Sequence, residues 1–484
     1  MRIERVEIRD FRCFSKYTCN LTSGANVLIG HNGAGKTTLI HAIHRALSFL
    51  FSNDRSLGSD FLSKGNNTLN VRSFHESDYH FDLERKEVAA DVSVKAEAIY
   101  NGKRLSWELY RRNQPNATLY QSLYKNAFAA FMNEWREEGA SLPLLAYYSD
   151  SYPHRYVKTV KYALDIVNNG AMPRNFGYYQ WDEEAACTSL WETRICNCLN
   201  KIQPYYTLMS RVASDLYSLK EENEGGRSLE DNPEYKRLQM EEQRILDITS
   251  APMEEVGFVE DYLKKFVSLL PGVMGTGREI DFFSASQTND GFQLTLHLKN
   301  GETVLLQDLP AGYRRLYSIV FDMAYRSYIL NGGREPEGIV IIDEIDLHLH
   351  PELEQRVVSC FMEVFPKVQF IVSTHSPLVI TNLREKNGEN QVLRMDIGAV
   401  SPSVVNDVYG LDYNTGIEDI MGVDARDVEI DNLLNTVTYF EVNGMKEQLK
   451  NVKALLLEKL GGNEKHMDDL LAKRKEEMGD EIHQ

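Results

Sequence analysis

The eight residues Gly30 to Thr37 constrain this chain more than any other part of its sequence. They read Gly-His-Asn-Gly-Ala-Gly-Lys-Thr and fit the phosphate-binding pattern G-x-x-x-x-G-K-[ST]. The apolar run Val27 to Ile29 precedes this loop and predicts a strand. From Lys36 to about Phe51 apolar residues recur at helical spacing, at Leu39, Ile40, Ile43, Leu47 and Leu50. This order of strand, loop and helix predicts a P-loop and an α/β fold.

The chemistry of such a loop is nucleotide binding. Its glycines let backbone N–H groups turn inward around the β- and γ-phosphates, and the N-terminus of the following helix adds a positive dipole. Lys36 is expected to neutralise phosphate charge, and the Thr37 hydroxyl to coordinate Mg²⁺. We therefore expect ATP and Mg²⁺ as cofactors, bound by Gly30, Asn32, Gly33, Gly35, Lys36, Thr37 and Thr38.

A second apolar run ends in two carboxylates. Gly338 to Ile342 predicts a buried strand, and Asp343 and Glu344 follow it directly. Asp343 is expected to hold Mg²⁺ through its water shell, and Glu344 to polarise the attacking water. An acidic pair at a strand end is otherwise a common surface feature. The preceding phosphate loop is what favours a metal-binding and catalytic role here.

A histidine follows the next apolar strand, Phe370 to Val372, within the sequence Ser373-Thr374-His375-Ser376-Pro377. Open parallel sheets place ligand contacts at the carboxyl ends of their strands. His375 is therefore expected to hydrogen-bond the γ-phosphate or the attacking water. A lone histidine is more often structural or simply exposed, but the convergence of several strand ends favours a function in this case.

The charge balance limits the class of nucleic-acid partner. The chain of 484 residues has 53 Lys and Arg against 71 Asp and Glu, a formal net charge of -18. This excludes a protein that coats nucleic acid with its whole surface, and leaves only local DNA contacts. Candidates are Lys103, Arg104, Arg111 and Arg112, and a second cluster of Arg155, Lys158 and Lys161 interleaved with Tyr152 and Tyr156. Ordinary solvated charge is the alternative for both clusters.

Cysteine usage and hydropathy point to a cytoplasmic protein. The six cysteines contain no C-x-x-C pair, so we expect free and mostly buried thiols. The chain does not start with a charged and then apolar leader. No apolar run approaches the roughly 20 residues of a spanning helix, so no membrane partner is expected.

The strand signal is interrupted by a helical region. Period-two alternation over Asp91 to Arg111, with a turn at Asn101-Gly102, predicts a hairpin. Positions 181–271 lose this alternation and predict helical runs, including Pro233 to Ile248 and Phe258 to Leu270, in an insertion too short for a long coiled-coil arm. Strands return at Glu279. We expect a discontinuous head (1–180 and 272–410), a helical insertion (181–271) and a C-terminal helical region (411–484).

These motifs together resemble a known family. The phosphate loop, the stretch Asp343 to Pro351 and the stretch Ser373 to Pro377 look like the ABC/SMC-type ATPases of the overcoming-lysogenization-defect (OLD) and Septu group. The opening Asp10-Phe11-Arg12-Cys13-Phe14 is similar to that group's first strand, and the likeness covers roughly residues 1 to 380. The resemblance implies an α/β fold: an ABC-type P-loop ATPase head with an antiparallel β lobe and a helical insertion, plus a C-terminal helical tail.

The resemblance also implies a second copy of the chain. In this superfamily two heads sandwich ATP, and each supplies an L-S-x-G signature motif to the other. The corresponding segment here is Leu309-Pro310-Ala311-Gly312, in which Pro310 replaces the serine, so slow turnover is expected. Gly312 would allow close backbone approach, Arg314 or Arg315 would meet phosphate, and Asp346 resembles the aspartate that crosses to the partner. The implied assembly is a homo-oligomer, at least a dimer.

The tail resembles the C-terminal helices of the PtuA family, the ATPases of the Septu anti-phage system, with related ATPases in some retrons. That family's partner is an HNH nuclease, PtuB. The tail carboxylates Asp424, Asp427, Glu429 and Asp431 are expected to form a solvated face, so the chain itself is not expected to be a nuclease. The resemblance thus implies an ATPase subunit of a bacterial anti-phage complex that regulates a separate nuclease. Two alternatives to this function stay open: an SMC-like DNA-repair or chromosome-handling ATPase, and a nucleotide-dependent scaffold with little hydrolysis.

Overall fold

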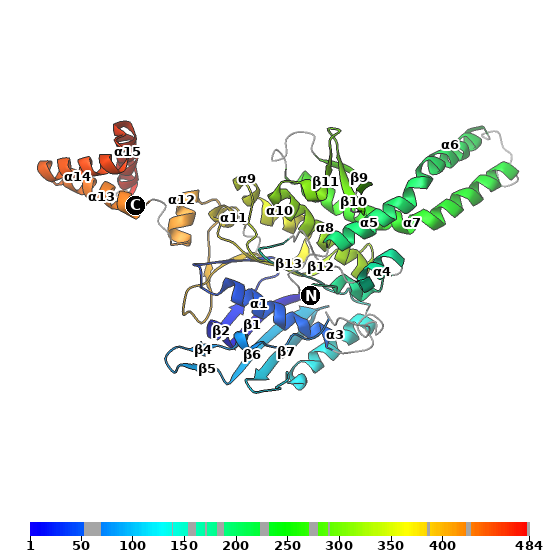
Figure 1. The fold of residues 1–484 in the computed structure, drawn as a ribbon, viewed down its shortest axis with the longest axis horizontal. Helices are drawn as coiled ribbons and strands as arrows, with labels where there is room; N and C mark the ends of the chain where they lie inside the picture. Colours follow the sequence, from blue (N-terminus) through cyan, green and yellow to red (C-terminus); the bar gives the residue numbers. More distant parts are fainter. Residues whose placement is uncertain are drawn as a thin grey trace. The chain divides into compact units, whose positions relative to one another are not determined.

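The structure, a computed structural model, describes residues 1–52, 69–137, 139–152, 161–169, 172–181, 188–222, 232–270, 279–288, 291–384, 388–422 and 427–481. By its internal contacts the chain divides into two compact units, Met1–Gly410 and Leu411–Gln484. Figure 1 shows the fold, with labels on its helices and strands.

The central sheet of the first unit has six strands, in the order β15-β14-β3-β13-β12-β8. All neighbouring pairs are parallel except β14 and β15. The five residues of β3 and the five of β8 are all buried, as expected for strands covered on both faces. The bounds are Ala25–Ile29 (β3), Leu144–Tyr148 (β8), Glu337–Ile342 (β12), Lys367–Ser373 (β13), Gln391–Arg394 (β14) and Ser403–Val405 (β15).

An antiparallel sheet in the order β2-β1-β6-β7 forms the lobe beside it. Its bounds are Arg2–Phe11 (β1), Phe14–Asn20 (β2), Asp91–Tyr100 (β6) and Lys103–Arg112 (β7). The predicted hairpin turn is confirmed, because Asn101 and Gly102 have φ of 48° and 76°. Trp107 of β7 fixes the lobe to the head: its Nε1 donates to the Ala46 carbonyl at 2.8 Å, and its ring stacks on Phe49.

Shorter elements complete the head. They are α1 (Lys36–Leu47), η1 (Ser48–Phe51), η3 (Glu76–Asp78), β4 (Phe81–Asp82), β5 (Glu87–Val88), η4 (Gln121–Leu123), α3 (Lys125–Glu137), α4 (Lys161–Asn169), η5 (Arg174–Tyr178), α9 (Pro351–Glu354), α10 (Val357–Val364) and α11 (Pro377–Thr381). A small antiparallel sheet of β9 (Ile280–Thr288), β10 (Gly291–Leu298) and β11 (Thr303–Leu305) leads through η8 (Leu306–Asp308) into the long helix α8 (Ala311–Asn331).

The insertion contains α5 (Thr188–Ile202), η6 (Gln203–Tyr205), α6 (Tyr206–Glu222) and α7 (Pro233–Ser268). The two predicted helical runs belong to a single helix, because the 36-residue α7 continues through Pro252. Proline removes one backbone hydrogen bond, but both halves of α7 have a buried face that keeps them helical. Leu238 and Ile245 pack on α6, whereas Val259 and Phe266 are buried beyond the proline.

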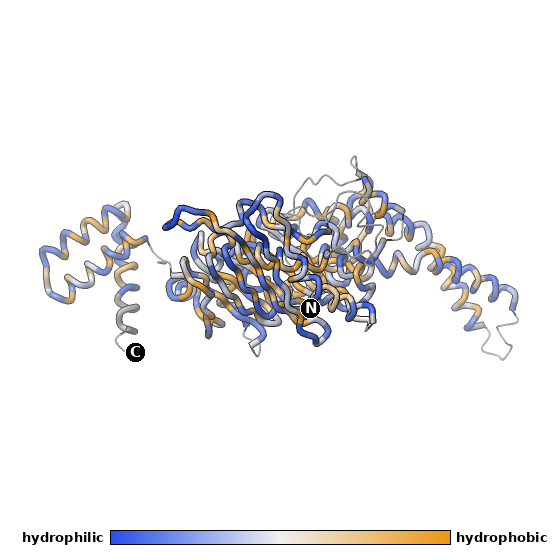
Figure 2. Tube along the Cα trace, turned by 90° about the horizontal axis from the view of Figure 1, so that it is seen from below, coloured by the Kyte–Doolittle hydropathy of each residue, from blue (hydrophilic) through white to orange (hydrophobic). Residues whose placement is uncertain are grey.

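The helices α6 and α7 form a helical hairpin that projects from the head (Figure 1). Hydrophobic and hydrophilic residues alternate along both helices (Figure 2), as expected for a pair with one shared apolar stripe. That stripe holds the buried residues Val212, Leu216, Leu238 and Ile245. The loop predicted over Glu222 to Asp231 lies almost entirely outside the described residues.

The second unit has its own small core. Its elements are α12 (Tyr413–Thr415), the π-helical η9 (Gly416–Ile420), α13 (Val428–Val442), α14 (Lys446–Lys459) and α15 (Glu464–Glu481). Leu434, Val437, Leu456 and Leu471 are buried together. The Asp427 side chain caps α13, and Glu429 pairs with Lys459 at 2.6 Å. These two carboxylates therefore have structural partners; Asp424 lies outside the described residues.

Two findings bear on the expectations from composition. Of the six cysteines, Cys13, Cys19, Cys196, Cys198 and Cys360 are free thiols, all buried except Cys13, and Cys187 lies outside the described residues. Burial raises the pKa of Cys19 to about 12, which makes it an unreactive thiol. Among the helices that the structure describes, none is long and apolar enough to cross a membrane.

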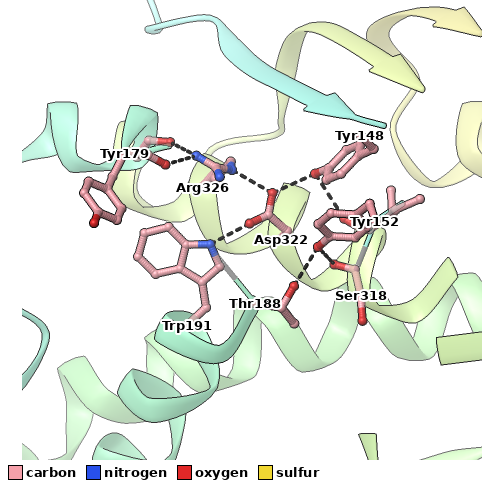
Figure 3. A network of polar contacts seen from close by, with 10 residues as sticks. Tyr148, Tyr152, Tyr179, Thr188, Trp191, Ser318, Asp322 and Arg326 are labelled. Atoms are coloured by element: carbon pink, nitrogen blue, oxygen red, sulfur yellow. Dashed lines mark hydrogen bonds and ion pairs between the residues drawn. The ribbon is translucent and has the colours of Figure 1, made fainter. Parts of the chain in front are cut away.

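A buried polar network joins α8 to β8 and α5 (Figure 3). The Asp322 carboxylate accepts hydrogen bonds from Trp191 Nε1 at 2.6 Å, Tyr148 OH at 2.8 Å and Arg326 Nε at 2.6 Å. Arg326 in turn donates to the carbonyls of Gly177 and Tyr179. Asp322 and Arg326 are 1% and 3% exposed, so each charge depends on the other for compensation.

Replacing Asp322 by alanine should therefore destabilise the head severely. The substitution leaves a buried guanidinium without its carboxylate, at a cost of about 3–5 kcal/mol. Denaturant unfolding measures this change, with Asp215→Ala on the exposed face of α6 as the control, expected within about 0.5 kcal/mol of the parent. A cost below about 1 kcal/mol for Asp322→Ala would mean that the network does not anchor α8.

Candidate functional site

The phosphate loop lies between the end of β3 and the start of α1 and is folded around its own lysine. Lys36 Nζ donates to the Gly30 carbonyl at 2.7 Å and to the His31 carbonyl at 3.3 Å. Gly30, Gly33 and Gly35 have φ of 139°, 84° and 99°, which L-residues rarely adopt. Asn32 and Thr37 are exposed, and Thr38 is half-buried. Part of the loop and the Thr37 side chain are therefore accessible from solvent.

Two contacts that the sequence did not predict hold this loop in place. A Cβ on Gly35 would lie 2.5 Å from Phe14 Cζ, so the turn between β1 and β2 packs directly on the loop. A Cβ on Gly30 would lie 2.2 Å from the Met395 carbonyl, which follows β14. The sequence did mark the segment that makes the first contact, because Phe14 is the last residue of the Asp10–Phe14 motif that resembles the family's first strand. No local pattern marks Met395.

The two acidic residues stand where β12 ends. Asp343 is buried, its backbone N–H donates to the Tyr148 carbonyl at 2.8 Å, and its Oδ1 accepts a short hydrogen bond from Ser373 Oγ. Glu344 has φ of +51°, a left-handed conformation that costs a non-glycine residue about 1–2 kcal/mol. Its N–H donates to Ser373 Oγ at 2.8 Å. The sequence did not single out Ser373, which contacts both residues.

The parallel pairing of β13 with β3 and with β12 places the phosphate loop and the acids at one edge of the sheet. Burial lowers the pKa of Lys36 below its ordinary value, while the charges of Asp343, Glu344 and Asp346 act in the opposite direction. Residues from opposite ends of the head sequence are therefore close enough to influence one ammonium group. The same geometry suits Mg²⁺, which binds few protein oxygens and keeps several waters. Thr37 offers an exposed hydroxyl and Asp343 a carboxylate.

Asp346 and His375 lie at the same edge. Thr374 Oγ1 donates to Asp346 Oδ1 at 2.7 Å, and the His375 N–H reaches the same oxygen at 3.4 Å. The side chain of His375 is exposed. Asp346 is thus held by the segment that carries His375, and both can be reached from solvent beside the phosphate loop.

The signature-like segment precedes α8. A Cβ on Gly312 would lie 2.5 Å from the His348 carbonyl, so the close backbone approach expected at Gly312 occurs within the chain itself. Pro310 is the N-cap of α8 and makes no side-chain cap hydrogen bond. Arg314 is half-buried and donates to the Gln307 carbonyl at 3.2 Å.

The alternative that Arg315 meets phosphate is wrong. This side chain is 1% exposed, and its guanidinium donates to the carbonyls of Asp150 at 2.7 Å, Ser149 at 3.3 Å and Asp343 at 2.8 Å. It therefore ties α8 to the ends of β8 and β12. Burial lowers the pKa of Arg315, and the nearby carboxylates act against that shift.

The basic residues considered for DNA are mostly engaged within the chain. Lys103 pairs with Glu134, Arg104 with Glu4, and Arg111 donates to the Ala117 carbonyl. Arg112 lies over the Tyr120 ring. Tyr152 is buried, with its hydroxyl bonded to Thr188 and the Ser318 carbonyl, so its expected role beside the second cluster is wrong (Figure 3). Lys161 is exposed, and Arg155, Tyr156 and Lys158 lie outside the described residues.

Two histidines lie behind the loop on α1. The His44 ring is 4.9 Å from Tyr147 and 4.6 Å from Trp181, and its Nε2 is buried without a hydrogen-bond partner. Burial lowers the pKa of His44 to about 3 and that of His41 to about 4. No group of three or more His, Cys, Asp or Glu with metal-binding geometry occurs in the described part of the chain.

Comparisons with known proteins show what the chain is similar to. Residues 2–392 match the profile of the RecF/RecN/SMC N terminal domain. The chain is 25% identical over 418 residues to a retron Vc95 probable ATPase of Vibrio cholerae serotype O1 biovar El Tor, covering 79% of this chain and 72% of the relative. It is 26% identical over 154 residues to the Septu protein PtuA of Bacillus thuringiensis, covering 29% and 37%.

Among solved structures, the chain is similar to an Smc head domain with an extended coiled coil, bound to the C-terminal domain of ScpA, from Pyrococcus furiosus. The TM-score is 0.40 at 14% identity, over 84% of this chain and 96% of that one.

The buried His44 predicts a pH dependence of stability. The folded protein keeps this ring neutral down to pH about 3, whereas an unfolded histidine takes up its proton near pH 6.5. Between these values the unfolded state binds one more proton, so the free energy of unfolding falls by about 1.4 kcal/mol per pH unit as the pH drops. In His44→Phe the change of the free energy of unfolding with pH should be smaller, by up to about 1.4 kcal/mol per pH unit.

Urea unfolding between pH 7 and pH 5 measures the slope. The exposed His466→Gln serves as the control and should leave it unchanged. Equal slopes in His44→Phe and the parent protein would show that folded His44 takes up its proton over the same pH range as an unfolded histidine, which would contradict the lowered pKa.

Proposed function

Because the chain belongs to the RecF/RecN/SMC N-terminal-domain family, we propose that it is the ATP-binding and hydrolysing subunit of a bacterial anti-phage defence complex. The observation that carries the proposal is the parallel pairing of β13 with β3 and β12, which brings the phosphate loop and the acidic pair Asp343 and Glu344 to one edge of the sheet. The defence role is supported by the relatives named as a retron ATPase and a Septu protein.

The chain's own groups would divide the work of hydrolysis. Backbone N–H groups of Gly33 and Gly35 and the Lys36 ammonium would bind the phosphates, and Thr37 and Asp343 would hold the metal. When bound, Mg²⁺ supplies neutralisation of the charge on the β- and γ-phosphate oxygens. Glu344 accepts a proton from the attacking water, and His375 donates a hydrogen bond to the γ-phosphate. The left-handed backbone conformation of Glu344 fixes the direction in which its side chain leaves the backbone.

We further propose that two copies sandwich ATP. The second copy would add Arg314 and Asp346, with 1–180 and 272–410 as the ATPase head and 181–271 as the insertion. In that arrangement the γ-phosphate contacts both subunits, so ATP favours the closed dimer and ADP does not. Gly312 is packed against the His348 carbonyl of its own chain and would shape the start of α8. Pro310 offers no hydroxyl at the N-terminus of α8, which favours slow turnover.

The proposed partner is a separate HNH nuclease similar to PtuB, with residues 411–484 as the region for partner binding or oligomerisation. The separate core of that unit supports this division. The acids Asp427 and Glu429 are committed to a helix cap and an ion pair, which supports a chain without nuclease activity of its own.

Pro310 also supports a second candidate, a nucleotide-dependent scaffold with little hydrolysis. A third, an SMC-like DNA-repair or chromosome-handling ATPase, would act on DNA ends. Phosphate release with and without DNA separates the two: the scaffold releases little in either case, and the repair ATPase is stimulated by DNA.

Lys36→Ala should weaken Mg-ATP binding by about 100-fold, because charge-assisted contacts to the phosphates are lost. Glu344→Gln should bind Mg-ATP normally but lose turnover by about 10²–10⁴-fold, because the base is gone. Calorimetry and phosphate release measure these effects, with the exposed Lys125→Ala as the matched control. Normal ATP binding by Lys36→Ala would refute the site assignment.

Copurification with the proposed HNH nuclease partner should give one complex that contains both chains. Native mass measurement of Glu344→Gln with ATP should show at least two copies of this chain, held by the trapped nucleotide. The parent without ATP should give a smaller mass or a mixture. A complex with a single copy of this chain in both conditions would exclude the sandwich.

A further inference from the structure

Ser373 is the last residue of β13, the strand between β3 and β12. Parallel pairing sets Ser373 opposite Leu28, two residues before the phosphate loop, and Val372 opposite Ile342, just before Asp343. This side chain therefore stands between the two halves of the proposed nucleotide site. It is 1% exposed, so its hydroxyl must find partners inside the protein.

Both partners belong to the acidic pair. Ser373 Oγ donates its only proton to Asp343 Oδ1 and accepts the backbone N–H of Glu344 at 2.8 Å. A hydroxyl has one donor and can accept at the same time, so one atom serves two residues of different function. The Ser373 carbonyl accepts a third bond, from Ile345 N–H at 3.0 Å.

The bond to Glu344 bears on catalytic geometry. Glu344 has a left-handed backbone, and such a conformation persists only where neighbouring groups hold it. Without Ser373, the Glu344 N–H would lose the acceptor that it has at the buried end of β12. By accepting this N–H, Ser373 holds the peptide that aims the Glu344 side chain.

The bond to Asp343 bears on the metal. With Oδ1 committed to Ser373, the rotation of the carboxylate is fixed, and its other oxygen has a defined direction. Metal ligands commonly depend on such an outer hydrogen bond for their orientation. The same serine thus orders a metal ligand and the proposed base.

On the basis of the proposed ATPase function, we propose that Ser373 is a positioning residue that orients Asp343 for Mg²⁺ and Glu344 for water activation through one hydroxyl. It does not contact the nucleotide itself. Its loss therefore affects Mg²⁺ dependence and turnover together, while binding of metal-free ATP by the phosphate loop persists.

The test compares Ser373→Ala with Ser373→Thr and with the control Ser376→Ala in the full-length protein. Ser376 lies on the same loop, but its hydroxyl caps α11 and contacts Glu354 instead of the acidic pair. Calorimetry measures ATP binding in EDTA and across a Mg²⁺ titration. Phosphate release gives kcat and KM, and thermal melting monitors folding.

For Ser373→Ala we expect ATP affinity in EDTA within about twofold of the parent, a half-saturating Mg²⁺ concentration raised at least about fivefold, and kcat lowered at least about tenfold with KM little changed. Ser373→Thr, which keeps the hydroxyl, should recover part of both losses, and Ser376→Ala should keep the parent Mg²⁺ dependence. Equal loss of ATP binding in EDTA and in Mg²⁺ would overturn the inference in favour of a merely structural serine. So would parent-like kcat and Mg²⁺ dependence.

These outcomes are distinct from failure of the proposed function. That failure is seen in the parent protein, as an absence of Mg-ATP binding, or in Glu344→Gln, as unimpaired turnover. When both of these behave as proposed, the Ser373 variants test the positioning role alone.

Discussion

The parallel pairing of β13 with β3 on one side and β12 on the other is the constraint on which the rest depends. The register sets Ser373 beside Leu28 and Val372 beside Ile342, so the phosphate loop, the acidic pair and the His375 segment all emerge at the same sheet edge. A slip of one residue would turn every side chain in β13 to the opposite face. The influence of the Asp343 charge on the pKa of Lys36 follows from this register and not from proximity in the sequence.

Buried polar side chains hold the loops at that edge and the lobe beside it. Arg315 binds carbonyls at the ends of β8 and β12, and Ser373 binds both residues of the acidic pair. At the other end of β13, the Gln369 amide exchanges two hydrogen bonds with the backbone of Ile3, which fixes the antiparallel lobe to the central sheet. Each of these groups would be costly if unpaired, so together they favour one arrangement of loops over its alternatives.

The sequence was most informative where the signal is local. The phosphate loop, the strand that ends at Asp343 and the turn at Asn101-Gly102 each depend on adjacent residues, and the fold class follows from their order. The continuity of α7 through Pro252, the burial of Arg315 and the contacts of Phe14 and Met395 with the loop depend on packing between distant segments. Arg314 and Arg315 are adjacent residues of the same type, so the sequence alone did not show which of them is buried. The packing of α8 against the ends of β8 and β12 buries Arg315. The role of Ser373 could not be predicted, because a serine at the end of a strand is common and its two partners follow a different strand.

The most direct test of this account is an experimental structure of the Glu344→Gln protein bound to Mg-ATP. The account predicts one triphosphate that contacts Lys36 and His375, with the metal held between Thr37 and Asp343 and with Arg314 of a second copy against the γ-phosphate. A nucleotide bound elsewhere, or Lys36 and Asp343 facing separate cavities, would contradict the single site on which the proposed function rests.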